Sequence, residues 1–182
     1  MAMRQEANRV LLKSVLIEAL RALNAGLGIE DAEAIYNDLS TLSDNEKWQR
    51  RLRGAYSRRL KGETKDKPVA LIDFKHPDRN RYHVVRQVRV EAQRSRIADI
   101  VVFVNGIPLV VIEAKCPLKA ADRSGQAFEQ IKQYERDIPR LFYPNAFSIV
   151  TDGMATLYGA TGAPSKFYAP WPDPWPRSRD RL

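Results

Sequence analysis

Three ionisable residues in the middle of the chain, Asp99, Glu113 and Lys115, stand at one end of two apolar runs. The runs, residues 100–104 and 109–112, consist mainly of Val, Ile and Leu, which favours β-strands buried on both faces. Charged groups are costly in such a place unless they pair or hold a metal ion. Glu113 and Lys115 are two residues apart, so in a strand they point to the same face. The pattern therefore predicts a shared site.

The turn between the two runs decides whether the acids can meet. Asn105 and Gly106 form a dipeptide typical of a β-hairpin turn. A turn of these two residues alone, with regular pairing, leaves Asp99 and Glu113 on opposite faces of the sheet. A three-residue loop, or a β-bulge between Asn105 and Pro108, sets Asp99 directly across from Glu113. The shared site requires one of these two irregularities.

Two carboxylates at cross-strand distance with a lysine beside them suit Mg²⁺ or Mn²⁺, since both ions prefer oxygen ligands. The Ala114 carbonyl, between Glu113 and Lys115, is a further potential ligand. The pattern is equally compatible with a structural ion pair between Asp99 and Lys115, with Glu113 solvated at the strand end. From the residues alone, both interpretations stay open.

Asp99, followed by Glu113-Ala114-Lys115, resembles the D…ExK motif of the PD-(D/E)xK nuclease superfamily. The stretch RIADIVVFVNGIPLVVIEAKCP is more specifically similar to the N-terminal nuclease domain of the restriction (R) subunit of type I restriction–modification enzymes. The likeness covers nearly the whole chain. It continues through residues 71–74, 80–87, 130–134 (a QxxxY pattern), 138–142 and 148–153.

The resemblance implies a restriction-endonuclease-like core, in which Asp99, Glu113 and Lys115 are catalytic. Gln130 and Tyr134 are expected to pack beside the site and steady the metal and the DNA. A first-helix glutamate often reaches toward the metal in this superfamily, and Glu6 and Glu18 are the candidates. Neither has a motif around it, and we favour a solvated helix face for each.

The resemblance also implies partners. The substrate is expected to be double-stranded DNA, cut without sequence choice at the point of cleavage. The methyltransferase and specificity subunits are expected to join through a full-length R subunit. R subunits are far longer and carry a DNA-translocating helicase motor. No GxxxxGK[ST] motif occurs in this chain, so we expect no ATP site here and interpret the chain as a fragment or a truncated product.

The composition fits one compact domain of 182 residues. The formal net charge of +8 favours a polyanionic partner. The single cysteine, Cys116, excludes an internal disulfide and agrees with a reducing compartment. No apolar run reaches transmembrane length and no signal-peptide pattern is visible, so the cytoplasm is the expected location.

The arginines that would track a phosphate backbone are Arg50, Arg51, Arg53, Arg94 and Arg96. The first three lie near the end of a predicted helix. Cations also stabilise a helix C-terminus, which is the structural alternative for this cluster.

The remaining elements predict an α/β fold, with a central mixed β-sheet flanked by helices and an N-terminal helical segment. The predicted helices span residues 4–24, 30–40, 44–59 and 122–137, and the further strands span 69–74, 82–90, 146–151 and 155–158. We expect the nuclease domain to span residues 1–167, with a helical part at 1–62 and a sheet core at 69–160. Residues 168–182, dense in Pro and Trp, are expected to form a linker without regular structure.

The chain is therefore predicted to be a metal-dependent endonuclease domain. Two alternatives remain: a DNA-binding or docking module that is inactive in isolation, and a free-standing RecB-like exonuclease. Metal-dependent nicking by the isolated chain distinguishes the endonuclease from the docking module. Closed circular DNA compared with linear DNA distinguishes both from the exonuclease.

Overall fold

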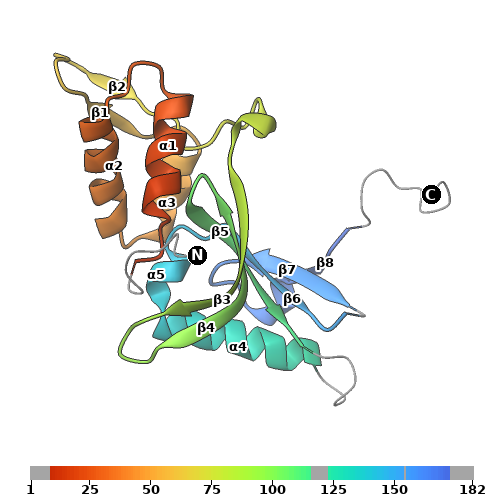
Figure 1. The fold of residues 1–182 in the computed structure, drawn as a ribbon. Coiled ribbons are helices and arrows are strands. Elements are labelled where there is room, and N and C mark those ends of the chain that lie inside the picture. The colour runs from red at the N-terminus through yellow and green to blue at the C-terminus, as the bar shows by residue number, and fades with distance from the viewer. Residues whose placement is uncertain (1–8, 116–122, 154, 173–182) are drawn as a thin grey trace.

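A mixed sheet of six strands forms the centre of the computed structural model, which describes residues 9–115, 123–153 and 155–172 (Figure 1). The strands follow one another in chain order across the sheet, and only the β5–β6 pair is parallel. They are β3 (Tyr82–Val90), β4 (Arg96–Val104), β5 (Ile107–Ala114), β6 (Phe147–Thr151), β7 (Thr156–Ala160) and β8 (Ala169–Pro170). The predicted α/β class with a mixed sheet is confirmed.

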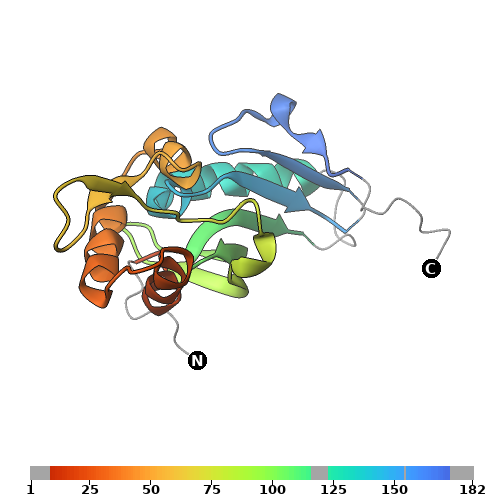
Figure 2. The same cartoon turned by 90° about the horizontal axis from the view of Figure 1, so that it is seen from above.

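A helical part precedes the sheet and lies at one end of it, away from β7 and β8 (Figure 2). Its helices are α1 (Lys13–Leu23), α2 (Ile29–Thr41) and α3 (Asn45–Leu52), followed by a small antiparallel pair, β1 (Ser57–Arg59) and β2 (Asp66–Pro68). Two short 3₁₀ helices, at Pro77–Arg79 and Ser165–Phe167, lie in connecting loops. The predicted N-terminal helical segment is therefore present.

Two hydrophobic clusters hold these parts together. One joins the three N-terminal helices to the tip of the β4–β5 hairpin through Ile107. The other lies between the sheet and α4 (Arg123–Asp137), which is followed by the short α5 (Pro139–Phe142). Helix α4 turns an apolar stripe toward the sheet, since Ala127, Ile131 and Tyr134 are all buried. Helix α4 thus covers the sheet face below the centre of the hairpin.

The hairpin turn is anchored to the helical part by backbone and amide hydrogen bonds. Asn105 and Gly106 have φ angles of 52° and 79°, the left-handed pair of a type I′ turn. The Gly106 carbonyl accepts a 2.9 Å hydrogen bond from the Leu12 amide. The buried Asn105 amide donates to the Leu71 carbonyl at 2.9 Å and to Asn80 Oδ1 at 2.8 Å. The position of the two hairpin strands is therefore fixed from the turn.

The β4–β5 pairing contains the irregularity that the sequence required. Val104 pairs with Ile107 across a two-residue turn, so the three-residue loop is wrong. The register then shifts between Phe103 and Val102, because Leu109 is an extra residue on β5. The predicted bulge is confirmed, although its extra residue directly follows Pro108 and does not precede it.

Two predicted helices are too long. The first begins at Lys13, since residues 9–12 are not helical and the Leu12 amide bonds to the turn; residues 4–8 lie outside the described part. The third ends at Leu52 and not at residue 59. Gly54 follows with φ 97°, the left-handed conformation that terminates helices.

The predicted strand at residues 69–74 is wrong. Val69 and Leu71 are buried as an alternating strand would place them, but the Asn24 side chain satisfies the backbone between them. Asn24 Oδ1 accepts from the Ala70 amide at 2.8 Å and Asn24 Nδ2 donates to the Ala70 carbonyl at 3.0 Å. A side-chain amide thus replaces a neighbouring strand.

The expectation that no regular structure follows residue 167 is also wrong at Ala169–Pro170, which pair with β7. Trp171 packs there against Phe147 and Tyr158, with ring centroids 6.2 and 5.4 Å away. Residues 173–182 lie outside the described part, and the domain division stays a prediction. Among the described residues, no helix has the length and apolar character needed to cross a membrane.

Candidate active site

Asp99 is held between two neighbouring strands. The shifted register pairs Ile100 with Ile112, so Asp99 and Glu113 are the residues that follow the last pair of the hairpin on its two strands. At this point the Ala114 amide donates to Asp99 Oδ2 at 3.1 Å, so a side chain replaces the backbone ladder. Gln87 Nε2 on β3 donates to Asp99 Oδ1 at 3.3 Å. Both carboxylate oxygens therefore have a donor.

Glu113 is fully buried, which is unusual for a glutamate. Its Oε1 accepts a 2.6 Å hydrogen bond from Lys115 Nζ. Its Oε2 is buried without a hydrogen-bond partner. Burial raises the pKa of Glu113 above its ordinary value, and the nearby negative charge of Asp99 raises it further, while Lys115 opposes the shift. The site thus contains a buried carboxylate oxygen that can still accept a hydrogen bond or bind a cation.

A chain of polar contacts from α4 holds Lys115 in place. Lys115 Nζ donates to Gln130 Oε1, and Gln130 Nε2 donates to the Tyr134 hydroxyl. The Tyr134 hydroxyl in turn donates to the Ile97 carbonyl on β4 at 2.8 Å. Burial raises the pKa of Tyr134 to about 12, so this hydroxyl keeps its proton at neutral pH. Gln130 and Tyr134 are four residues apart on one helix face, and that spacing brings both into the chain that ends at the lysine.

The simple structural alternative does not describe this site. It required an Asp99–Lys115 ion pair with Glu113 in solvent. In the structure Lys115 pairs with Glu113, which is buried, and Asp99 is held by Gln87 and Ala114. The arrangement is therefore a composite of β3, β4, β5 and α4.

The donor set fits a hard divalent cation. Among the residues described, no group of three or more His, Cys, Asp or Glu side chains forms a closed metal site. Mg²⁺ commonly binds through one or two carboxylates and completes its shell with water and substrate phosphate. Asp99, the unpartnered Oε2 of Glu113 and the Ala114 carbonyl offer oxygen ligands of this kind.

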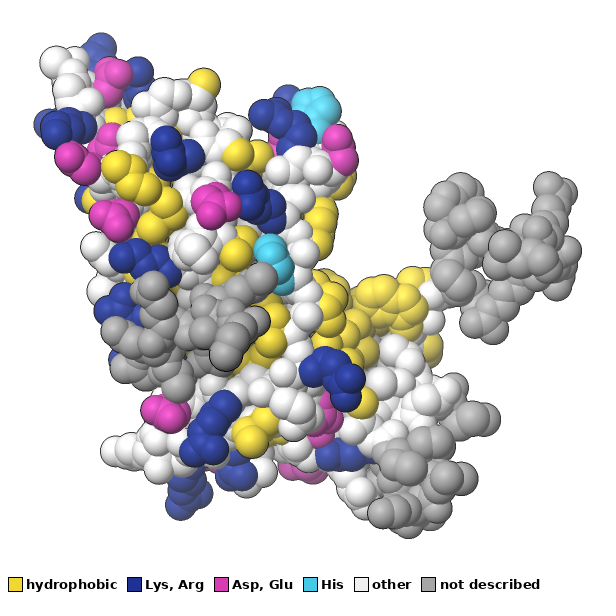
Figure 3. Space-filling model, viewed as in Figure 1, with side chains coloured by type: hydrophobic (Ala, Val, Ile, Leu, Met, Phe, Trp, Pro, Cys, Tyr) yellow, Lys and Arg dark blue, Asp and Glu magenta, His cyan; other side chains and the backbone are white. Residues whose placement is uncertain are grey.

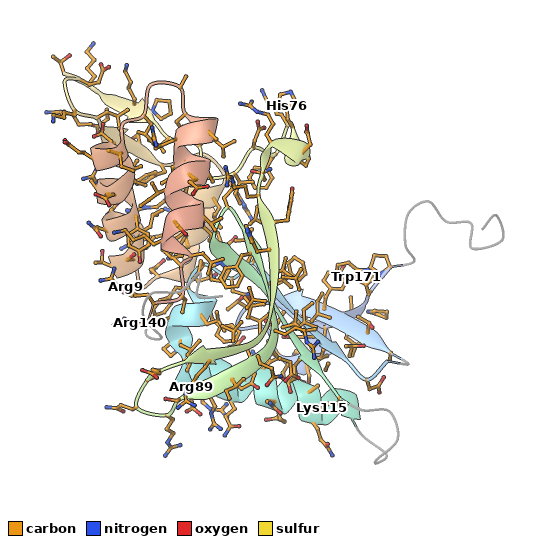
Figure 4. All side chains as sticks on the ribbon, viewed as in Figure 1. Arg9, His76, Arg89, Lys115, Arg140 and Trp171 are labelled. Atoms are coloured by element: carbon orange, nitrogen blue, oxygen red, sulfur yellow. The ribbon has the colours of Figure 1, made fainter. Side chains whose placement is uncertain are left out.

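Other ionisable residues lie elsewhere. Glu18 pairs with Arg81 at 2.6 Å and is largely exposed, while Glu6 lies outside the described residues. His76 sits in a loop at the opposite end of the molecule from Lys115 (Figure 4). Neither Glu18 nor His76 is part of the candidate site.

The arginines singled out from the sequence have different surroundings. Arg50 pairs with Glu46, and Arg51 pairs with Asp38 at 3.0 Å and stacks over the Tyr56 ring. Arg96 pairs with Asp137 at the end of α4. Arg53 and Arg94 are exposed. On the face that Figure 3 shows, Lys and Arg side chains are spread over the helical part and the lower edge.

Sequence reasoning missed Gln87 as part of the site. No general pattern marks a glutamine in a strand as the partner of an aspartate on the next strand. The available signal was its place in the stretch 80–87 that shares the resemblance.

The comparisons with known proteins identify the family to which the chain is similar. Residues 1–167 match the family described as type I restriction enzyme R protein N terminus. The type I restriction enzyme HindI endonuclease subunit of Haemophilus influenzae is 39% identical over 112 residues, which cover 60% of this chain and 11% of the relative. A putative type I restriction enzyme MjaIXP endonuclease subunit of Methanocaldococcus jannaschii is 32% identical over 170 residues, which cover 86% of this chain and 16% of the relative.

The chain thus spans only 11% to 16% of the length of these two relatives. The matched region includes the whole hairpin and α4, the elements that form the candidate site. The chain belongs to the family of type I restriction enzyme R protein N-terminal domains.

Proposed function

We propose that this chain is a Mg²⁺- or Mn²⁺-dependent endonuclease domain of the PD-(D/E)xK type that hydrolyses phosphodiester bonds of double-stranded DNA. The observation that carries the proposal is the buried Glu113 in the neighbourhood of Asp99 and Lys115. Its Oε1 pairs with Lys115, and its Oε2 has no hydrogen-bond partner. An unsatisfied buried carboxylate oxygen is unfavourable unless a cation or proton neutralises it. The relatives support the nuclease assignment, since each is described as an endonuclease subunit.

Asp99, Glu113 and the Ala114 carbonyl would hold the ion. When bound, it supplies Lewis-acid charge to the scissile phosphate and activates water as the nucleophile. The raised pKa of Glu113 means that a proton competes with the ion for this oxygen. Asp99 is held in position at both oxygens, by Gln87 and by the Ala114 amide.

Lys115 carries the positive charge that the protein itself provides. Its ammonium group, held by Glu113 and Gln130, would contact the scissile phosphate and stabilise the charge that develops there. The Gln130–Tyr134–Ile97 contacts fix the direction in which the ammonium points. This preorganisation is the role that we assign to the QxxxY face of α4.

The biological setting is a type I restriction complex. We propose that the chain acts on cytoplasmic DNA within a longer R subunit, which assembles with methyltransferase and specificity subunits. Sequence choice and ATP-driven movement would then belong to other parts of that assembly. Arg50, Arg53 and Arg94 are the exposed candidates for phosphate contact within the proposed set.

The test is nicking of closed circular plasmid by this chain at stoichiometric concentration with Mn²⁺ or Mg²⁺. We expect slow nicking that EDTA abolishes and that Asp99→Ala, Glu113→Ala and Lys115→Ala each reduce at least about a hundredfold. Glu18→Gln, in an exposed ion pair outside the site, is the matched control and retains nicking.

Wild-type chain that binds plasmid without nicking it would instead support the docking module. Cleavage of linear DNA from its ends, with closed circles untouched, would support the exonuclease. Either result contradicts the proposal.

A further inference from the structure

Gln87 has a backbone conformation that its residue type does not favour. Its φ is 52°, in the left-handed region, and within the described residues Asn105 is the other non-glycine residue with positive φ. Asn105 lies in a tight turn, where asparagine commonly adopts this conformation. Gln87 instead lies in the middle of β3, and its two neighbours both pair with residues of β4. Such strain persists only where the surrounding structure imposes it.

The strain coincides with a point at which both strands switch the sheet face to which alternate side chains point. Residues three apart in a regular strand point to opposite faces. On β4, however, Ala98 and Val101 both face the cluster under α4, and on β3 so do Val88 and the partly buried Val85. The register passes from Arg86–Ile100 to Val88–Ala98 without a shift. The switch of faces therefore occurs at Gln87, with its left-handed backbone, and at Asp99, the residue opposite it on β4.

The side chain of Gln87 then contacts the residue that this switch of faces positions. Gln87 Nε2 donates to Asp99 Oδ1 at 3.3 Å, while the Ala114 amide donates to Oδ2. One donor comes from β3 and the other from β5, on either side of the aspartate. Two donors on opposite strands determine the direction in which this carboxylate faces.

We propose that Gln87 is a positioning residue for Asp99: its left-handed backbone and its amide set the aspartate in the orientation that receives the divalent ion. This role rests on the proposed function. Partners that orient a metal ligand commonly change metal affinity by about 10- to 100-fold when removed. A purely structural role for Gln87 predicts a change in stability without this change in affinity.

Gln87→Gly separates the two roles. Glycine adopts a positive φ without strain, so the metal-free variant should unfold at a urea concentration no lower than that of the wild type. It lacks the amide, so its dissociation constant for Mn²⁺, measured by electron paramagnetic resonance of free and bound ion, should rise about tenfold. Gln87→Ala, which lacks the amide but keeps a β-carbon, should show the same loss of affinity. Its urea midpoint should be lower than that of Gln87→Gly, because alanine keeps the backbone strain.

Gln93→Gly is the matched control, since Gln93 is exposed in the loop that joins β3 to β4. Its Mn²⁺ dissociation constant should equal that of the wild type. An unchanged dissociation constant in both Gln87 variants, with Asp99→Ala abolishing binding, would overturn the positioning role and leave the proposed metal site standing. Wild-type affinity in Asp99→Ala would overturn the metal site itself.

Discussion

Asp99 and Glu113 lie close enough for their charges to interact, directly beyond the last β4–β5 pair, because β5 carries one extra residue, Leu109, between the turn and the site. With regular pairing across the same two-residue turn, the two carboxylates would lie on opposite faces of the sheet. The bulge thus converts a short Asp/Glu/Lys pattern into a group of charges that share one face. Its neighbour Pro108 donates no ladder hydrogen bond, which favours an irregularity here.

Removing the Tyr134 hydroxyl should release the Gln130 contact that positions Lys115, while the phenyl ring still fills its place in the core. Tyr134→Phe deletes the donor to the Ile97 carbonyl and the acceptor for Gln130, so the Gln130 amide is no longer fixed. We expect a loss of about 1 kcal/mol in the free energy of unfolding and reduced plasmid nicking. Tyr143→Phe, at a half-buried tyrosine outside this chain of hydrogen bonds, is the control. Equal nicking by the two variants would show that the α4 contacts do not serve Lys115.

The raised pKa of Glu113 makes metal-free stability depend on pH. Burial raises the pKa, so the folded protein holds this proton more tightly than the unfolded chain does. The resulting stabilisation is complete below the unfolded value of about 4.3 and is lost as pH rises through the folded pKa. Glu113→Gln lacks this titration.

In EDTA, the urea midpoint of Glu113→Gln relative to the wild type should therefore increase as pH rises above about 4.3. A midpoint difference that stays constant with pH would mean that the folded and unfolded pKa values of Glu113 are the same.

Gly106 should tolerate no side chain. A β-carbon there would lie 2.7 Å from the Leu12 carbonyl oxygen and 2.9 Å from the Leu16 amide nitrogen. Gly26 has nearly the same φ, 81°, with nothing within 4 Å of an added β-carbon. Gly26→Ala therefore measures backbone strain alone, and we expect it to lower the free energy of unfolding by more than about 1 kcal/mol. Gly106→Ala should destabilise by a further 1–3 kcal/mol, roughly the cost of overpacking, in chemical denaturation. Equal losses would show that α1 moves away from the turn freely.

The proposed DNA contacts of α3 can be tested through salt dependence. Arg50→Ala/Arg53→Ala leaves Arg51 and its ion pair with Asp38 intact, so the helix keeps its packing. If both arginines bind phosphates, the slope of log affinity against log salt should fall by about 0.9 for each phosphate that is no longer neutralised. The titration uses a short duplex with Ca²⁺ in place of Mg²⁺ to prevent cutting. An unchanged slope would assign this end of α3 to another subunit or to solvent.

The strongest sequence patterns predicted their elements well. The β4–β5 hairpin, β3 and α4 follow from long apolar runs and helical spacing, and local turn residues fix their ends. The bulge followed from geometry, since only an irregular hairpin lets Asp99 meet Glu113. The position of Leu109 as its extra residue depends on packing that the sequence does not display.

The errors share a physical cause: long-range contacts replaced local preferences. The segment 69–74 has the alternation of a strand, but Asn24, distant in sequence, takes the hydrogen bonds of Ala70. The short β8 forms despite Pro170, because the Tyr158–Trp171 contact lies beside it. Gln87 carries no local signal for a left-handed conformation, which tertiary packing imposes.

Joint binding of a divalent ion by Asp99 and Glu113 is the property on which the proposed function depends. Crystals of the chain soaked in Mn²⁺ and measured at the manganese absorption edge test it most directly. We expect an anomalous peak in contact with both the Asp99 carboxylate and Glu113 Oε2. No peak there at saturating Mn²⁺, or a peak bound by other residues while Glu113 contacts Lys115 alone, would contradict it.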